Sequence, residues 1–133
     1  MIYLKTREEI ELLRENNLLV SRALAEVGRQ LKAGMTTRDV NDIADAFIRA
    51  NGAIPAFLGY QGYPAASTVS VNEQVVHGIP SDYVIKNGDI VSVDLGTFMK
   101  GFVGDSAYTF AVGEVSDEVR QLLDVTKEAL RRG

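Results

Sequence analysis

The stretch "DIVSVDLGTFMKGFVGDSAYTF", residues 89–110, predicts two β-strands joined by a tight turn. One carboxylate lies in the middle of each predicted strand, Asp94 in the first and Asp105 in the second. Aspartate is depleted in strands because its side chain competes for backbone hydrogen bonds. Two aspartates in the most apolar part of a hairpin therefore need an explanation beyond strand formation.

The register of the hairpin decides whether the two acids meet. A two-residue turn at positions 99–100 pairs Phe98 with Gly101. Counting outward from that pair places Asp94 directly opposite Asp105. A four-residue turn keeps this register, whereas a three-residue turn puts the acids on opposite faces. Carboxylates that face each other repel, so we expect such a pair to need a cation, a shared proton or a basic partner.

Two interpretations of the acids remain open on the residues alone. In the first, one acid caps a turn and the other pairs with Lys100 or an arginine. In the second, two hard oxygen ligands on adjacent strands anchor a divalent cation, or a bridged pair of cations. The chain has one histidine and no cysteine, so any transition-metal site would have few candidate nitrogen ligands.

Three amphipathic helices are expected around this hairpin. Thr6 and Glu9 form a capping box that begins a helix ending near Lys32. Its apolar stripe, in which Asn17 is the only polar member, comprises Ile10, Leu13, Asn17, Val20, Leu24, Val27 and Leu31. A second helix is expected to begin after Thr36 or Thr37 and to end at Asn51-Gly52, and a third from about residue 117 to residue 132.

The pattern changes to strands and loops between the second and third helices. The segment "GAIPAFLGYQGYPAAS", residues 52–67, is rich in glycine, proline and aromatic residues and predicts an ordered loop. The following segment, "TVSVNEQVVHGIP", begins with the alternation of a strand. This order of elements predicts one α+β domain over residues 1–133, with an antiparallel sheet covered by helices.

Composition limits the classes of function. The net charge is −4, the estimated pI is about 5.0 and no basic run occurs, so we do not expect nucleic acid as a partner. The absence of cysteine excludes a disulfide framework and thiolate chemistry. No apolar run approaches the roughly 18 residues of a membrane span, and the charged start does not resemble a signal peptide. We therefore expect a soluble, cytoplasmic protein that does not bind a membrane.

The histidine and two loop tyrosines are further candidate site residues. His77 follows a predicted strand, and Gly78 and Pro80 restrict the loop after it. A lone histidine more often bonds to backbone in a half-buried position, but this one can also act as an acid–base or hydrogen-bonding group near neutral pH. Tyr60 and Tyr63 can line an apolar pocket, although spacing alone favours ordinary loop packing.

Taken together, these segments resemble the methionine aminopeptidases in their short bacterial form. The matching stretches are "TREEIELLRENNLLV", "FLGYQGYPAAS", "SVNEQVVHGIPSD", "NGDIVSVDLGT" and "GFVGDSAYTFAVG". The resemblance covers essentially the whole chain. Its histidine loop separates this family from the prolidases and creatinases, which share the fold and the metal carboxylates.

The resemblance implies a role for each matched residue. Asp94 and Asp105 fall on two of five ligands to a pair of divalent metal ions, Co, Mn, Fe or Zn, with Asp105 bridging both ions. His77 falls on the active-site histidine that contacts the substrate. The pocket for the methionine side chain is implied at Tyr60, Tyr63 and Thr68, where Thr68 stands in place of a cysteine frequent in the family. The implied substrate is the N-terminal methionine of a peptide or nascent chain.

The resemblance also implies that the sequence is half of a larger unit. Members of the family are about twice this long, and their pita-bread fold consists of two similar halves related by a pseudo-twofold axis. The three remaining metal ligands come from the second half. We therefore expect weak metal binding and weak or no activity from this chain alone. The alternative is a non-enzymatic half-domain that forms a homodimer or requires a complementary C-terminal half.

Overall fold

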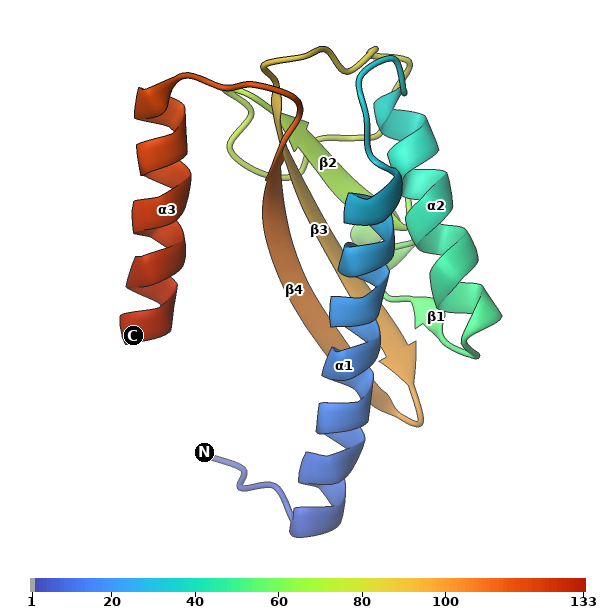
Figure 1. The fold of residues 1–133 in the computed structure, drawn as a ribbon. Helices are drawn as coiled ribbons and strands as arrows, with labels where there is room; N and C mark the ends of the chain where they lie inside the picture. The colour runs from blue at the N-terminus through green and yellow to red at the C-terminus, as the bar shows by residue number, and fades with distance from the viewer. Residues whose placement is uncertain (1) are drawn as a thin grey trace.

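A computed structural model describes residues 2–133 and shows an α+β arrangement (Figure 1). The elements in chain order are α1 (Arg7–Gln30), α2 (Thr37–Ala50), β1 (Ile54–Pro55), a 3-10 helix (Tyr60–Gly62), β2 (Ser67–Val71), β3 (Ile90–Met99), β4 (Phe102–Ala111) and α3 (Asp117–Arg132). The predicted helices and hairpin are thus all present. The first helix ends two residues earlier than expected.

Side-chain caps set the beginnings of the helices. At α1, the Thr6 hydroxyl accepts a hydrogen bond from the Glu9 amide at 3.2 Å, and the Glu9 carboxylate accepts one from the Thr6 amide at 2.8 Å. Thr36 and Asp39 form the same reciprocal capping box at α2. These bonds satisfy backbone donors that have no partner inside the helix, which is why the helices begin where the sequence predicts.

The sheet is antiparallel and is centred on β3. Strand β4 pairs with β3 along its whole length, while β2 and the short β1 pair with the opposite edge of β3. The hairpin turn consists of Lys100 and Gly101, whose φ angles of 52° and 84° are those of a type I′ turn. The expected turn at residues 99–100 is therefore wrong by one position, because a type I′ turn needs two residues that accept positive φ and glycine takes the second place.

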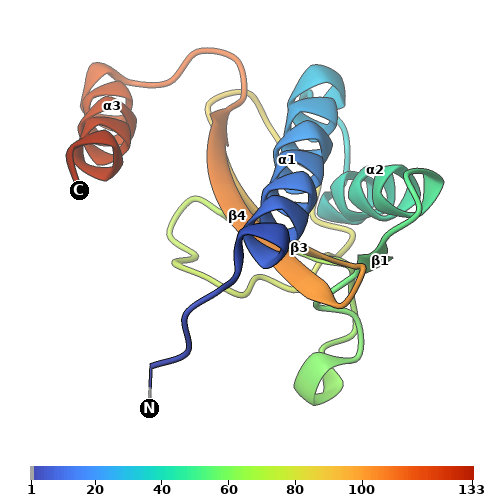
Figure 2. The same cartoon turned by 90° about the horizontal axis from the view of Figure 1, so that it is seen from below.

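Helices α1 and α2 cover one face of the sheet (Figure 2). The inward residues of β3 are Val91, Val93 and Leu95, all fully buried against the two helices. The remaining core comprises Leu19, Val20, Ala23, Leu24 and Val27 from α1, Val40, Ala44 and Ile48 from α2, Val69 and Val71 from β2, and Ala53, Ile85 and Val112 from the connecting segments. The period of two along β3 directs Asp94 to the opposite face, away from both helices.

The buried stripe of α1 differs from the expected one. Asn16 is its fully buried polar member, whereas Asn17 and Ile10 are exposed. Residues 16 and 17 are about 100° apart around a helix, so the rotation of α1 against the sheet decides which of them is buried. The prediction that Asn17 is the polar member of the stripe is therefore wrong.

Helix α3 has the expected bounds but no buried side chain. Figures 1 and 2 show it standing apart from α1 and α2, beside β4. Leu122, Val125 and Leu130 are 59%, 59% and 84% exposed. Its contact with the sheet includes the Lys127 ammonium group, which lies 5.8 Å from the centre of the Tyr108 ring. Among residues 2–133, no helix has the length and apolarity needed to cross a membrane.

Candidate functional site

The two acids of the hairpin share one face of the sheet but do not lie directly opposite each other. Asp94 pairs with Ala107, and Asp105 pairs with Gly96. Because the actual turn moves the register by two residues, the acids are diagonal neighbours on adjacent strands. The predicted direct opposition is therefore wrong, while the predicted common face is confirmed. Diagonal neighbours are still within reach of one shared ligand.

The environment of Asp94 disfavours its ionised form. Burial of the carboxyl group and the neighbouring negative charge of Asp105 raise the pKa of Asp94 to about 6, while His77 acts in the opposite direction. Near neutral pH Asp94 is therefore mostly ionised, although it lies in a partly desolvated place beside a second acid. A divalent cation between them would relieve the repulsion.

A pocket of about 570 Å³ gathers every site residue that the sequence suggested. Its lining consists of Phe57, Tyr60, Gln61, Gly62, Tyr63, Pro64, Thr68, His77, Ile79, Asp94 and Asp105. Five of these lining residues were not predicted from the sequence: Phe57, Gln61, Gly62, Pro64 and Ile79. They could have been suggested by their positions, because they lie in the same two loops as Tyr60, Tyr63 and His77.

The acids lie at the polar end of this pocket, and aromatic residues form its walls. Thr68 is buried on β2 and pairs directly with Asp94 of β3, so both side chains point to the same face. Tyr63 is half-buried, and its hydroxyl lies 3.2 Å from two carbonyl oxygens, those of Ser67 and Gly78. Burial and the charge of Asp94 raise the pKa of Tyr63. Tyr60 is 67% exposed and therefore lies at the rim.

His77 reaches the pocket from a loop that is tied to β2. The residue is exposed and has a φ of 60°, an unusual conformation for a non-glycine residue. The buried Gly78 beside it donates its amide to the Ser70 hydroxyl at 3.0 Å and accepts a bond from the Val69 amide at 2.9 Å. These two hydrogen bonds hold the loop against β2 directly after His77.

The donor set suits a divalent cation but is incomplete. Asp94 and Asp105 supply hard carboxylate oxygens on a rigid hairpin. Within residues 2–133 there is no group of three or more histidine, cysteine, aspartate or glutamate residues able to hold a metal ion. A cation held by these two carboxylates alone would keep most of its water.

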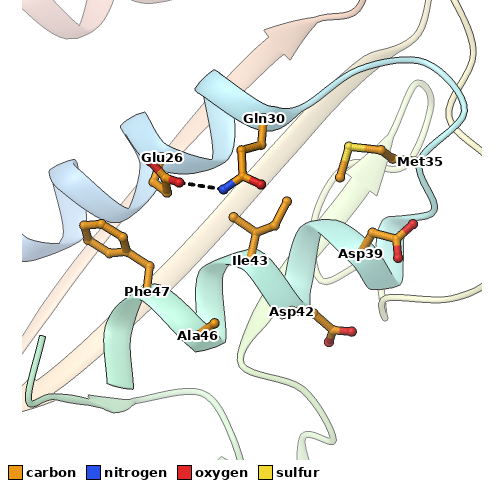
Figure 3. A pocket seen from close by; sticks show the side chains of 8 residues that line it. All are labelled: Glu26, Gln30, Met35, Asp39, Asp42, Ile43, Ala46 and Phe47. Atoms are coloured by element: carbon orange, nitrogen blue, oxygen red, sulfur yellow. Dashed lines mark hydrogen bonds between the residues drawn. The ribbon is translucent and has the colours of Figure 1, made fainter. Parts of the chain in front are cut away.

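A second pocket, also of about 570 Å³, lies between α1 and α2 on the other side of the sheet (Figure 3). Its lining consists of Glu26, Gln30, Met35, Asp39, Asp42, Ile43, Ala46 and Phe47. Two of its acids have local partners, because Glu26 pairs with Arg29 at 2.6 Å and Asp39 caps α2. None of the residues suggested by the sequence lies here, so the pocket of Asp94 and Asp105 is the candidate site.

Comparison with known proteins identifies the family. The family model described as metallopeptidase family M24 matches residues 11–133. Methionine aminopeptidase 1 of Bacillus subtilis is 44% identical over 133 residues, which is 100% of this chain and 54% of that protein. The chain thus spans about half the length of the curated relatives it matches.

Solved structures show the same relationship. The crystal structure of methionine aminopeptidase from Thermotoga maritima matches with a TM-score of 0.96 and 43% identity, covering 99% of this chain and 53% of that one. The Xaa-Pro dipeptidase from Bacillus anthracis matches with a TM-score of 0.82 and 28% identity, covering 95% of this chain and 34% of that one. The expected fold class, an α+β half of the pita-bread fold, is confirmed.

Proposed function

Because the chain belongs to metallopeptidase family M24, we propose that it contributes part of a metal-dependent site that removes N-terminal methionine from peptides and nascent chains. The observation that carries this proposal is the single pocket in which Asp94, Asp105 and His77 meet two tyrosines. We further propose that residues 1–133 form one domain, the N-terminal half of a catalytic domain. Action on nascent chains would place the protein in the cytoplasm.

Each residue has a role that its position supports. Asp94 and Asp105 would hold two divalent ions, Co, Mn, Fe or Zn, which when bound polarise the scissile carbonyl group and lower the pKa of water. His77, at the side of the pocket, would hydrogen-bond the substrate near the scissile bond. Tyr60, Tyr63 and Thr68 would surround the methionine side chain.

The isolated chain should bind metal weakly. Two carboxylates leave an ion mostly hydrated, and each missing ligand lowers affinity. We therefore expect little or no release of methionine from Met-peptides by the purified 133-residue protein. Robust metal-dependent turnover by this chain, free of host enzyme, would contradict the proposal that the site is incomplete.

Calorimetric titration with Mn²⁺ tests the assignment of the ligands. The double variant Asp94→Asn/Asp105→Asn should lose at least about tenfold in affinity, equivalent to about 1.4 kcal/mol, because neutral amides replace both anionic ligands. Affinity of the unmodified chain should also fall from pH 7.5 to pH 5, because a proton competes for the pair once the pH is below the raised pKa of Asp94, about 6.

The matched control is Asp42→Asn/Asp124→Asn, which removes the same charge from exposed positions outside the pocket that contains Asp94 and Asp105. It should bind Mn²⁺ as the unmodified chain does. Equal affinity of the two double variants would show that Asp94 and Asp105 are not the ligands.

A second candidate role is self-association, which the exposed face of α3 favours. Leu122, Val125 and Leu130 are exposed, and Tyr108 of β4, whose ring lies near Lys127 of α3, is 45% exposed. Strand β4 also pairs with no strand other than β3 among the described residues, although Asn17 of α1 occupies its outer edge at Asp105. We propose that a second copy of the chain, or a complementary C-terminal half, covers these surfaces. In the homodimer, Asp94 and Asp105 of both copies would approach the twofold axis.

Sedimentation velocity tests the homodimer. At tens of micromolar we expect a dimer that tightens with Mn²⁺ and loosens with a chelator, because converging carboxylates repel without a cation. Leu122→Lys/Val125→Lys should shift the protein to monomer, since it places two charges on the apolar face. Gln121→Lys/Asp124→Lys, on exposed polar positions of the same helix, is the control. A strict monomer with and without Mn²⁺ would refute the proposal.

A further inference from the structure

Two consecutive asparagines lie where α1 crosses the hairpin. Asn16 is fully buried at this crossing, in an otherwise apolar contact. Its side-chain oxygen accepts a hydrogen bond from the hydroxyl of Thr97 on β3, and its amide donates one to the carbonyl of Phe102 on β4 at 2.5 Å. One side chain therefore binds both strands close to their turn. A buried amide with all these bonds made fixes helix and hairpin in a single arrangement.

Asn17 turns outward and contacts the candidate metal ligand directly. Its side-chain oxygen accepts a hydrogen bond from the backbone amide of Asp105 at 3.3 Å. Its amide donates to the carbonyl of Leu13 at 2.9 Å, which fixes the side chain on the helix. The amide of Asp105 therefore lies on the outer side of β4, where no strand of the described chain pairs with it.

Gly104 allows this close approach. A Cβ atom at Gly104 would lie 2.9 Å from the carbonyl carbon of Asn16 and 3.1 Å from the amide nitrogen of Asn17. The backbone of α1 thus touches β4 one residue before Asp105. The helix holds the strand by direct backbone contact as well as by the two side chains.

We propose that Asn17 is a positioning residue that holds Asp105 in the geometry needed to share a cation with Asp94. Asn16 supports this role because it fixes α1 on the hairpin. The inference rests on the proposed function, in which the two acids are metal ligands. An edge strand is free to move where its outer amides lack partners, and a bridging carboxylate binds well only when it is pre-positioned. Asn17 supplies the outer partner at the one residue of β4 that would hold a metal ion.

The alternative is that Asn17 only helps α1 adhere to the sheet. The two explanations differ in the effect that Asn17→Ala has on stability. If Asn17 only holds α1 to the sheet, its loss should lower the unfolding midpoint. If Asn17 only positions Asp105, the midpoint should stay unchanged or rise slightly, because alanine is a better helix former than asparagine and position 17 is exposed. The positioning role thus predicts a change confined to the backbone at Asp105, without global destabilisation.

The experiment compares Asn17→Ala with Ser21→Ala in the full 133-residue chain. Ser21 makes a similar exposed bond on the same helix, from its hydroxyl to the Asn17 carbonyl at 3.1 Å, and its side chain makes no hydrogen bond to the described residues of the hairpin. In metal-free protein, we expect the amide hydrogen of Asp105 to exchange several-fold faster in Asn17→Ala than in Ser21→Ala. Mn²⁺ affinity should fall about threefold in Asn17→Ala only, a difference of about 0.7 kcal/mol.

The two readouts separate this inference from the proposed function. Unchanged exchange at Asp105 overturns the positioning role, whatever the metal result. Faster exchange with unchanged Mn²⁺ affinity also overturns it, because the contact would then not serve the metal. If the unmodified chain binds no Mn²⁺ at all, the proposed function itself fails, and the positioning role fails with it even if the Asn17–Asp105 contact is real.

Discussion

Replacing Gly78 with alanine is expected to destabilise the chain by about 3 kcal/mol and to move His77 out of the pocket. A Cβ atom at Gly78 would lie 2.3 Å from the carbonyl oxygen of Val69 and 2.9 Å from the Cα atom of Ser70. Both contacts are with backbone inside the sheet, so they cannot be relieved by turning a side chain. The loop that carries His77 must instead move away from β2 and break its hydrogen bonds there.

Urea unfolding followed by circular dichroism measures the loss of stability. The chain has one histidine, so its ring resonances report the displacement without ambiguity. Gly59→Ala is the matched control, because no atom lies within 4 Å of a Cβ there. It should cost only about 1 kcal/mol for the left-handed backbone at that residue. A Gly78→Ala variant as stable as this control would show that the contact with β2 is not a tight one.

Asn16→Ala is the second large effect, with an expected loss of about 3 kcal/mol of unfolding free energy. The substitution removes the side-chain acceptor of the buried Thr97 hydroxyl, which keeps only the longer bond of 3.4 Å to the Asn16 backbone carbonyl. It also removes the donor to the Phe102 carbonyl and leaves a small cavity. The gain in helix propensity, about 0.6 kcal/mol, offsets little of this loss.

A double-mutant cycle separates the hydrogen bond from the packing. Thr97→Val removes the hydroxyl but keeps the shape, so it isolates the bond between Thr97 and Asn16. In the Asn16→Ala background, Thr97→Val should cost less than in the unmodified chain, since the side-chain partner is already absent and only the longer bond to the Asn16 backbone carbonyl remains. Additive losses would mean that the two side chains do not interact as the structure shows. Asn17→Ala, one residue away and exposed, is the control for the helix itself.

For Asp94 and Asp105, the sequence predicts the shared face of the sheet correctly but not the register of the two strands. The common face of Asp94 and Asp105 was predictable, because side chains alternate along a strand and an even shift in register keeps that face. The exact register was not predicted, although a local signal existed. Glycine at 101 favours the second position of a type I′ turn, and that preference selects Lys100–Gly101 over the pair before it.

The sequence by itself determined the features that depend on neighbouring residues. The capping boxes at Thr6 and Thr36, the bounds of α2 and α3 and the hairpin follow from hydrogen bonds and periodicity within a few positions. Only the tertiary structure decided which of Asn16 and Asn17 is buried, because that depends on the rotation of α1 against the sheet. It also decided the pocket, since Phe57, His77 and Asp105 come from segments far apart in the chain and meet only when the sheet and its loops are packed.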